Sequence, residues 1–235
     1  MTTFVYDPLT CNLTSTTDPN NFTTTLTYDT AGNVKTSTDA EGKITEFFYD
    51  NMNRLRQVRD ANFQDTFYTY DAAGNILEDT QRSYVINAAG QVNNIRVGGS
   101  IVGTYSYDYN NLRTRKTVDG VTTYYVYGRN GLLYGEYDET GAPIREYVYL
   151  NGEPLAQIDV GELPLGENIV YLHTDHLGTP RAGSDENGTQ VWAWDSDAFG
   201  NGMPTGSATV NLRFAGQYYD EESGLHYNPK IRYRQ

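Results

Sequence analysis

The sequence of 235 residues contains one cysteine, Cys11, so no disulfide can form within a single chain. No apolar run approaches the roughly 18 residues that a membrane-spanning helix needs. The first residues show no basic segment followed by an apolar core, the pattern of a secretory signal peptide. These absences exclude a disulfide scaffold and predict a chain without a membrane span.

Positive charge is also scarce, because 17 Lys and Arg residues face 30 Asp and Glu residues, which gives a net charge of −13. A strongly negative chain repels the phosphates of nucleic acids and the headgroups of anionic membranes. We therefore expect no nucleic-acid partner. We interpret the acidity as a source of solubility combined with structural use of aspartate in turns, at Asp7, Asp18, Asp29, Asp39, Asp50, Asp60 and Asp71.

Tyrosine is abundant, with 21 residues, and much of it belongs to a recurring motif. One copy is Tyr70-Asp71-Ala72-Ala73-Gly74-Asn75-Ile76, which follows a run of alternating aromatic and polar residues. The aspartate can accept hydrogen bonds from backbone amides a few residues later, and Gly74 can adopt a positive φ. The motif predicts the end of one strand, a turn and the start of the next strand.

Copies of this motif begin at residues 6, 28, 49, 70, 86, 107 and 127, in steps of 22, 21, 21, 16, 21 and 20. Asn53 and Asn111 replace the turn glycine, and asparagine tolerates positive φ better than other non-glycine residues. A nearly constant period is typical of a repeat protein. The turn residues that we assign are Tyr28, Asp29, Gly32, Tyr49, Asp50, Asn53, Tyr70, Asp71, Gly74, Tyr107, Asp108 and Asn111.

A second turn lies halfway along each unit, as at Asp18–Asn21, Asp39–Gly42 and Asp60–Phe63. Two turns per unit leave two short runs rich in β-branched and aromatic residues, which predict strands. Each unit is then a β-hairpin, and successive hairpins are expected to pair into one long antiparallel sheet. The predicted fold is all-β with little or no helix.

The regular array extends over residues 1–150, and residues 151–168 form a less regular connection with Pro154, Pro164, Gly161 and Gly166. From residue 169 the sequence changes character. The segment Ile169–Arg181 does not resemble the turn repeat, and we treat residues 169–235 as a separate region.

The Tyr-Asp-x-x-Gly units resemble YD repeats, and the later blocks resemble the RHS repeat-associated core domain. These blocks are Tyr171–Arg181, Trp194–Gly200 and Arg213–Tyr233, so that the resemblance covers essentially the whole chain. Its core-motif residues are His173, Asp175, His176, Gly178, Pro180, Arg181, Trp194, Phe199, Gly200, Phe214, Gly216, Tyr218, Tyr219, Asp220, Gly224 and Tyr227.

The resemblance implies a structural function. RHS and YD-repeat proteins wind a long curved sheet into a shell, which in bacterial toxins encloses a C-terminal toxin. A bacterial chain is implied, made in the cytoplasm and then exported or displayed on the cell surface as part of a secretion system. Its implied partners are the remainder of a larger shell or an enclosed toxin polypeptide.

Many members of the family cleave themselves at aspartates directly after the core. In this chain the match stops before Arg234-Gln235, without the second Asp-Pro segment of the family. The self-cleavage role therefore transfers to no residue, and we expect a structural fragment of a shell rather than an enzyme.

Three clusters invite a chemical interpretation. His173 and His176 with Asp175 could ligate zinc, although their spacing does not match a helical zinc motif. Trp192 and Trp194 could form a platform for stacking sugars. Asp220, Glu221 and Glu222 could be carboxylates for hydrolysis, or part of another turn that ends at Gly224. We favour packing and turn roles for all three, and thus expect no catalytic, cofactor or metal site.

Two other functions stay open at this stage. A cell-surface module could bind a glycan or a partner protein through exposed Tyr and Trp residues, and a hydrolase or self-protease is the third hypothesis. A strip of sheet also has unpaired edges, which invite pairing with other chains. We therefore expect self-association through the open edges of the sheet.

Overall fold

The computed structural model describes residues 1–161, 167–197, 200–214 and 216–228, and these residues contain strands and turns but no helix. The chain divides into two compact units, residues 1–84 and residues 85–234, which are considered separately. The expected all-β fold of Tyr-Asp hairpins is confirmed. The boundaries that we placed at residues 150 and 168 stay a prediction.

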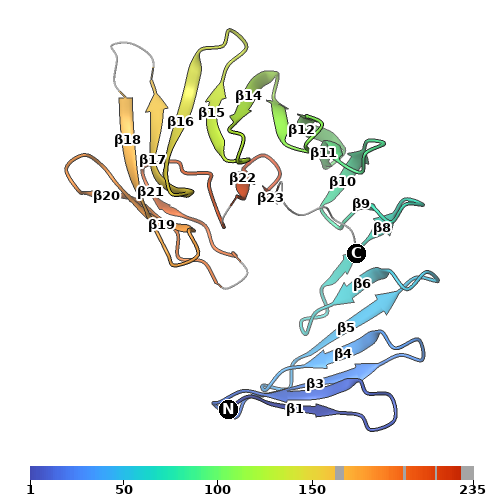
Figure 1. The fold of residues 1–235 in the computed structure, drawn as a ribbon. Helices are drawn as coiled ribbons and strands as arrows, with labels where there is room; N and C mark the ends of the chain where they lie inside the picture. The colour runs from blue at the N-terminus through green and yellow to red at the C-terminus, as the bar shows by residue number, and fades with distance from the viewer. Residues whose placement is uncertain (162–166, 198–199, 215, 229–235) are drawn as a thin grey trace. The chain divides into compact units, whose positions relative to one another are not determined.

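The first unit carries a sheet of seven antiparallel strands whose order follows the sequence (Figure 1). Two further short strands, β8 (Thr69–Tyr70) and β9 (Ile76–Glu78), follow it and pair with each other. The seven strands are β1 (Thr3–Tyr6), β2 (Leu13–Thr17), β3 (Thr23–Tyr28), β4 (Val34–Thr38), β5 (Ile44–Tyr49), β6 (Leu55–Arg59) and β7 (Asp65–Phe67).

The second sheet contains fourteen strands, in sequence order from β8 to β21. A separate pair, β22 (Tyr218–Asp220) and β23 (Leu225–Tyr227), forms a third sheet. The remaining strands are β10 (Arg82–Ile86), β11 (Val92–Val97), β12 (Ser100–Tyr107), β13 (Arg113–Val118), β14 (Val121–Tyr127), β15 (Leu133–Tyr137), β16 (Pro143–Leu150), β17 (Glu153–Val160), β18 (Glu167–Thr174), β19 (Pro180–Ser184), β20 (Gln190–Ala193) and β21 (Thr205–Gly206).

The turn between β3 and β4 shows how the repeat motif forms a hairpin. The Asp29 carboxylate accepts hydrogen bonds from the amides of Ala31 and Asn33, both at 2.9 Å. Gly32 has φ of +89°, and the strand register shifts at Tyr28, which pairs with Val34. A three-residue loop with a bulge at a positive-φ residue is a common hairpin connection. The two asparagines that replace this glycine, Asn53 and Asn111, have φ of +59° and +67°.

The array forms two sheets rather than the single sheet that the repeat predicts. The interruption lies at Tyr68, between β7 and β8, in the unit whose period is 16 residues instead of about 21. There the Phe67 amide donates to the hydroxyl of Thr80 at 2.7 Å instead of to a backbone carbonyl. The shortened unit leaves β9 with three residues, too few to continue the ladder beside Phe67.

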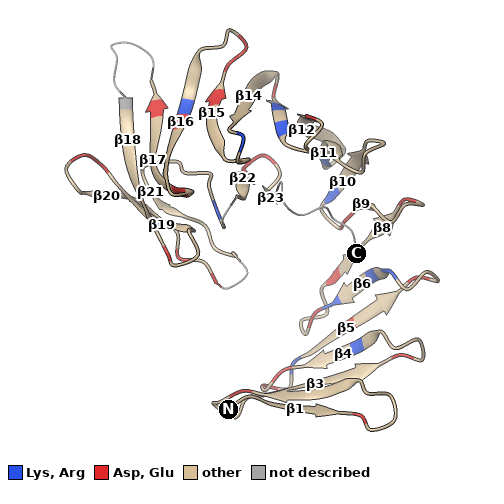
Figure 2. Ribbon diagram, viewed as in Figure 1, with Lys and Arg blue, Asp and Glu red and all other residues tan. Residues whose placement is uncertain are grey.

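Many acidic residues lie in the turns, whereas Lys and Arg lie mostly on strands (Figure 2). This distribution agrees with the interpretation that many aspartates serve the turns.

The two units differ in their cores. In residues 1–84 no apolar side chain is buried, and Gln57 is the only buried residue. The second unit has a cluster of buried residues that joins the sheet to the end of the chain: Tyr125, Leu133, Tyr147, Val170, Leu172, Trp192, Trp194, Val210, Leu212 and Tyr218. The C-terminal residues therefore complete the core of this unit.

Candidate functional site at the C-terminal segment

The candidate site is the place where the C-terminal segment packs on the large sheet, and we call it the seat of the segment. The C-terminal segment is defined as residues 207–228 without residue 215. Its start is tied to β20, because the amides of Ser207 and Ala208 donate to the Val191 carbonyl at 2.9 and 3.0 Å. Farther along, β22 and β23 pair only with each other and with Leu212. Side chains rather than a backbone ladder therefore fix these two strands on the large sheet, beside β13 and β15.

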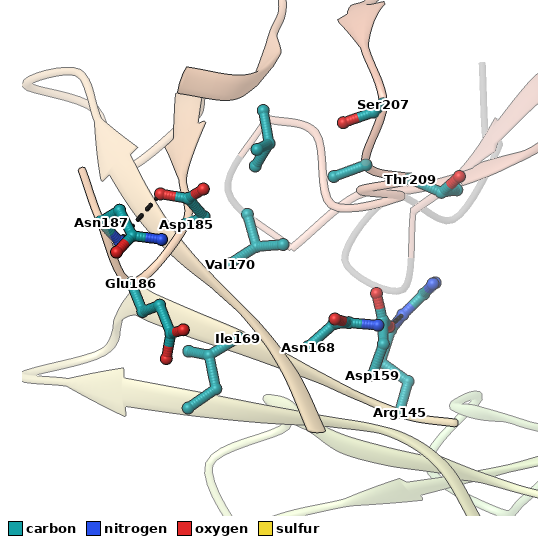
Figure 3. Close-up of a pocket in the computed structure, with 12 residues that line it drawn as sticks. Arg145, Asp159, Asn168, Ile169, Val170, Asp185, Glu186, Asn187, Ser207 and Thr209 are labelled. Carbon is teal, nitrogen blue, oxygen red and sulfur yellow. Dashed lines mark hydrogen bonds and ion pairs between the residues drawn. The ribbon is translucent and has the colours of Figure 1, made fainter. Parts of the chain in front are cut away.

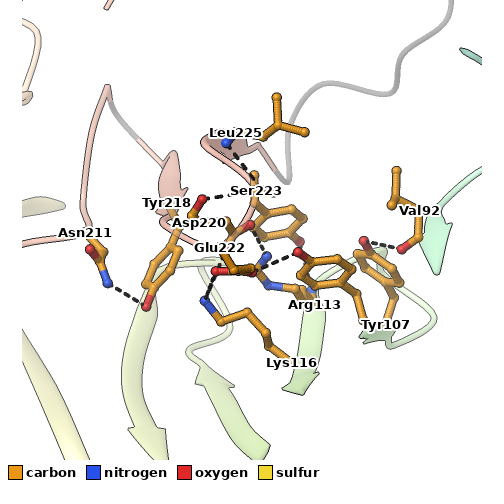
Figure 4. Close-up of polar contacts among 12 residues, drawn as sticks. Val92, Tyr107, Arg113, Lys116, Asn211, Tyr218, Asp220, Glu222, Ser223 and Leu225 are labelled. Atoms are coloured by element: carbon orange, nitrogen blue, oxygen red, sulfur yellow. Dashed lines mark hydrogen bonds and ion pairs between the residues drawn. The ribbon is translucent and has the colours of Figure 1, made fainter. Parts of the chain in front are cut away.

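Four charged residues join this segment to β13 (Figure 4). Arg113 Nη1 donates to Asp220 Oδ2 at 2.5 Å, and the Arg113 side chain is 2% exposed. Lys116 Nζ lies 3.2 Å from Asp220 Oδ1 and 3.1 Å from Glu222 Oε2. The segment thus supplies two carboxylates, and the sheet supplies the two cations that neutralise them.

Tyrosine rings surround the Arg113 guanidinium. Its central carbon lies 4.5 to 5.3 Å from the ring centroids of Tyr105, Tyr125, Tyr218 and Tyr227. A guanidinium over aromatic faces gains electrostatic energy, particularly where water is excluded. Burial lowers the pKa of Arg113, but the Asp220 carboxylate and neighbouring tyrosines together outweigh burial and hold the pKa well above its usual value. Arg113 is therefore charged.

A second buried carboxylate, Glu136 on β15, receives two tyrosine hydroxyls. The Tyr147 hydroxyl donates to it at 2.6 Å, and the Tyr218 hydroxyl lies 3.1 Å from both carboxylate oxygens. Burial raises the pKa of Tyr147 and of Tyr218, so both hydroxyls keep the protons that they donate. Glu136 therefore anchors Tyr218, two residues before Asp220.

Trp192 and Trp194 are each 1% exposed. Trp194 donates its indole N–H to the Gly202 carbonyl at 2.8 Å, and its ring contacts Phe214 with centroids 5.7 Å apart. A sugar-stacking platform requires an open ring face, so that interpretation of the pair is wrong. Both side chains pack between β20 and the C-terminal segment.

Arg213 stacks on the same tryptophans but faces no carboxylate among the described residues. It donates through Nη1 to the carbonyls of Val210 and Leu212, at 2.6 and 3.0 Å. Burial lowers the pKa of Arg213 to about 10. This guanidinium therefore remains protonated near neutral pH and holds the loop before β22.

The segment Tyr171–Arg181 contains a turn of the repeat type, although its sequence does not resemble the repeat. Asp175 accepts the amides of Leu177 and Thr179 at 2.9 and 3.1 Å, and Gly178 has φ of +76°. Thr174, paired with Pro180, occupies the position of the repeat tyrosine. Because the tyrosine is missing, the sequence pattern concealed the turn.

The remaining residues of this block have no catalytic geometry. His173 Nε2 lies 2.9 Å from Ser184 Oγ on the neighbouring strand, and His176 is exposed in the turn. Arg181 donates from Nε to Asp175 Oδ2 at 2.9 Å. The part of the chain that the structure describes holds no group of three or more His, Cys, Asp or Glu residues that could bind a metal ion.

Several core-motif residues shape backbone turns. Gly200, Gly216 and Gly224 have positive φ of 83°, 88° and 69°. A side chain at Gly200 would clash with the Phe214 ring, 2.8 Å from the position of the added carbon. Phe199, which the sequence analysis also assigned, lies outside the described residues.

The carboxylates of Asp220–Glu222 serve the seat of the segment. The amide of Gly224 donates to the Asp220 carbonyl at 2.8 Å, so a turn ends at this glycine. The Asp220 and Glu222 side chains are held by Arg113, Lys116 and Tyr105, and Glu221 is exposed. The hydrolytic pair that we considered is therefore committed to ion pairs.

A pocket of about 570 Å³ lies beside the segment, lined by strands β16 to β18, the turn at Asp185 and residues 207–209 (Figure 3). Arg145 and Asp159 form an ion pair in its wall, and Asp185 accepts the amide of Asn187 at 2.9 Å. These charged groups are satisfied by neighbouring protein groups. Arg145, Asp159 and Asp185 therefore serve the fold at this pocket.

Sequence reasoning missed Arg113, although the sequence carried a signal for it. In the repeat register the tyrosine of the motif pairs with the first strand residue after the turn. That residue is apolar in five units, at Leu13, Val34, Leu55, Ile76 and Leu133, but it is Arg113 where Tyr107 pairs. A charged residue at an apolar repeat position indicates a special partner.

These observations define a class of protein. Tyr-Asp hairpins that continue into an aromatic C-terminal segment make a β-shell repeat protein. The Teneurin YD-shell family model matches residues 2–233, so the chain belongs to the Teneurin YD-shell family. The resemblance to RHS and YD-repeat proteins is thereby confirmed.

Relatives with curated names are bacterial. The chain is 30% identical over 212 residues to the tRNA3(Ser)-specific nuclease WapA of Bacillus spizizenii, and this match covers 86% of the chain and 9% of the relative. It is 43% identical over 93 residues to toxin protein Tse5 of Pseudomonas aeruginosa, covering 39% of the chain and 7% of the relative. The double-stranded DNA deaminase toxin A of Burkholderia cenocepacia is 27% identical, with 86% and 19% covered.

The chain therefore spans less than a fifth of the length of these relatives. Among solved structures, TcdB2-TccC3 without its hypervariable C-terminal region aligns with 97% of this chain and 20% of its own chain, at 13% identity and a TM-score of 0.45. No helix of the described residues is long and apolar enough to cross a membrane.

Proposed function

We propose that this chain forms part of the wall of a shell that encloses another polypeptide, and that the C-terminal segment directs the following chain along the inner face of that wall. Membership of the Teneurin YD-shell family supports a structural role of the repeats. Enclosure of a second polypeptide is our proposal.

One observation carries this proposal. The C-terminal segment seats its buried carboxylate Asp220 on Arg113 of the sheet, 107 residues earlier in the chain. An ion pair removed from water contributes positional specificity more than net stability. A contact of this kind suits an element whose task is to fix where the chain leaves the wall.

The same proposal assigns no enzymatic activity to these residues. The nuclease and deaminase activities named for the relatives belong to whole proteins, of which this chain spans less than a fifth. The carboxylates and histidines that invited a chemical interpretation serve in ion pairs and turns.

The partners follow from the same account. They are the remainder of a larger shell and an enclosed toxin polypeptide, with further association through open sheet edges. The named relatives are bacterial, which supports a bacterial chain that is exported or surface-displayed as part of a secretion system. The net charge of −13 argues against a nucleic-acid partner.

The alternative function is a cell-surface module that binds glycans or a partner protein. Glycan binding was favoured by two tryptophans that could stack on a sugar. The tryptophans that would stack a sugar are buried beneath the C-terminal segment.

A protease-protection experiment tests enclosure. The same flexible peptide with one protease site is appended after Gln235 in one protein and before Met1 in another. Enclosure predicts slower cleavage of the C-terminal peptide, and the Arg113→Met variant, which loosens the segment, should lose much of the difference. Equal cleavage rates at both ends of the unmodified chain would contradict the proposal.

A further inference from the structure

One histidine lies against the aromatic core of the second unit. His173 and His176 are exposed, whereas His226 of β23 is half-buried. Its ring packs against Tyr219, its partner across β22 and β23, with ring centroids 5.4 Å apart, and against Trp194, with centroids 6.4 Å apart. The ring nitrogens of His226 make no hydrogen bond to a described residue. Among the described residues, aromatic contacts rather than polar partners therefore hold this imidazole.

The guanidinium of Arg213 shares both of these rings with His226. Its central carbon lies 4.9 Å from the Trp194 centroid and 4.9 Å from the Tyr219 centroid. An arginine over aromatic faces is attracted to them. Nη1 of Arg213 donates to backbone carbonyls, which carry no net charge. A proton on His226 would place a second positive charge in the same aromatic cluster, and like charges at close range repel.

The other charges around the His226 ring are already neutralised. Asp220 of β22 is the carboxylate that acts on His226, but two cations of β13 hold both of its oxygens. Arg181 of β19 contacts the Trp194 ring, with its central carbon 5.3 Å from the centroid, and is paired with Asp175 at 2.9 Å. Both of these carboxylates are therefore engaged with other cations.

The electrostatic surroundings favour a neutral His226 in the folded chain. Burial of the ring and the Arg213 charge lower the pKa of His226 below 6.5, and the Asp220 carboxylate opposes them only in part. The folded chain then binds this proton less tightly than the unfolded chain. The stability of the seated segment should therefore fall as the pH drops through 6.5 toward the lower folded pKa. This range is the one in which histidine ordinarily changes its charge.

The new charge would act on a part of the chain without backbone pairing to the large sheet. β22 and β23 form a sheet of their own, and side chains fix them on the large sheet. We propose that His226 is a pH-sensitive release of the C-terminal segment, neutral while β22 and β23 are seated and protonated as they loosen from the large sheet in mild acid. The use of such a release rests on the proposed function, because a loosened segment no longer fixes the path of the following chain.

Amide hydrogen exchange of the full chain at about pH 7.5 and at about pH 5.5 tests the release. After correction for the intrinsic pH dependence of exchange, protection of β22 and β23 should fall by about threefold or more at the lower pH, while protection of β14 to β16 changes less. His226→Phe keeps an aromatic ring that cannot be charged, so it should abolish this loss. The double variant His173→Gln, His176→Gln is the matched control and should respond to acid as the unmodified chain does.

A second measurement identifies the group that titrates. NMR of the imidazole ring protons should show that His226 titrates below 6.5. Arg213→Gln, which removes the neighbouring charge, should move this titration to higher pH. His226→Gln is a second uncharged variant for the case in which a phenylalanine ring disturbs the packing, and it should abolish the same loss of protection.

Two results would overturn the proposal. One is an equal loss of protection in acid for the unmodified chain and for both uncharged variants, because another group would then drive the release. The other is unchanged protection of β22 and β23 at the lower pH. Equal cleavage of the two appended peptides would reject enclosure and leave these exchange results in place, so the two proposals can fail separately.

Discussion

Arg113 of β13 and Asp220 of β22 form a buried ion pair across 107 residues of sequence, with 2.5 Å between Nη1 and Oδ2. The pair joins the repeat array to the C-terminal segment at the place where four tyrosine rings exclude water. Arg113 stands at the register position where other repeat units carry an apolar residue. The seat of the segment is therefore built by a local departure from the repeat.

Replacing Arg113 by Met should destabilise the second unit strongly. Within the described part of the chain the change leaves the buried Asp220 with Lys116 as its only ion-pair partner. Loss of one partner of a buried pair typically costs about 3–5 kcal/mol. Chemical unfolding followed by the fluorescence of Trp192 and Trp194 measures the free energy of unfolding. Arg115→Met is the matched control, because Arg115 lies exposed on the same strand and should change stability by less than about 0.5 kcal/mol. Equal losses for the two variants would contradict this role of Arg113.

Tyr49→Phe should destabilise the first unit by about 0.5–1.5 kcal/mol, because the Val34 carbonyl, 2.9 Å from the Tyr49 hydroxyl, loses its hydrogen-bond donor. Tyr124→Phe removes the hydroxyl of a strand tyrosine that is 41% exposed and makes no hydrogen bond to a described residue. This control should be nearly neutral in the same thermal-unfolding measurement. A neutral Tyr49→Phe variant would mean that this hydroxyl link adds no stability.

Phe63→Gly should stabilise the first unit by up to about 1 kcal/mol. A left-handed conformation costs an L-residue about 1–2 kcal/mol, and the greater freedom of glycine in the unfolded chain offsets part of that gain. Phe63 is the turn residue between β6 and β7, with φ of +62° and a side chain that is 81% exposed. The substitution therefore relieves strain and loses little packing. Asn62→Gly, next to it at an ordinary φ, is the control and should be neutral or destabilising because it only loosens the unfolded chain. A loss of stability in Phe63→Gly would contradict the argument.

Acid should weaken the repeat turns. Hydrogen bonds from the side chains of Asn33 and Asn75, aided by backbone amides, lower the pKa of Asp29 and of Asp71 below 3.8 in the folded chain. A carboxylate with a lowered folded pKa stabilises the fold fully above its unfolded pKa, and this contribution is lost as the pH falls through the folded pKa. The melting temperature should therefore fall as the pH drops from about 5 to 2, where such carboxylates are protonated.

The double variant Asp29→Asn, Asp71→Asn should show a flatter dependence over the same pH range. Asparagine can perform this role, because Asn87 accepts the amides of Ala89 and Gln91 at 2.9 and 3.0 Å in its own turn. Parallel pH curves for the variant and the unmodified chain would show that these carboxylates do not control the acid response.

The hairpins and their turns could be predicted from the sequence because they are local. Asp71, Gly74 and the flanking tyrosines lie within seven residues, and their chemistry alone specifies a turn. The interruption of the sheet at Tyr68 depends on the length of the following repeat unit. The step of 16 residues between motifs can be read from the sequence, but only the paired strands show that the Phe67 amide loses its backbone partner.

The seat of the C-terminal segment could not be predicted in the same way. Arg113 and Asp220 are far apart in sequence, and no spacing rule joins a repeat position to a later turn. The turn at Asp175 was missed because Thr174 replaces the tyrosine on which the pattern depended. Packing of Trp192 and Trp194 was favoured from the sequence, but their aromatic contact with Phe214 could not be predicted.

Hydrogen exchange of the full chain tests the central claim, that the C-terminal segment is an integral part of the sheet unit. The amides of β22 and β23 should be protected to an extent comparable with those of β14 to β16, and Arg113→Met should remove protection from β22 and β23 first. Rapid exchange of β22 and β23 in the unmodified chain, with β14 to β16 still protected, would contradict the claim.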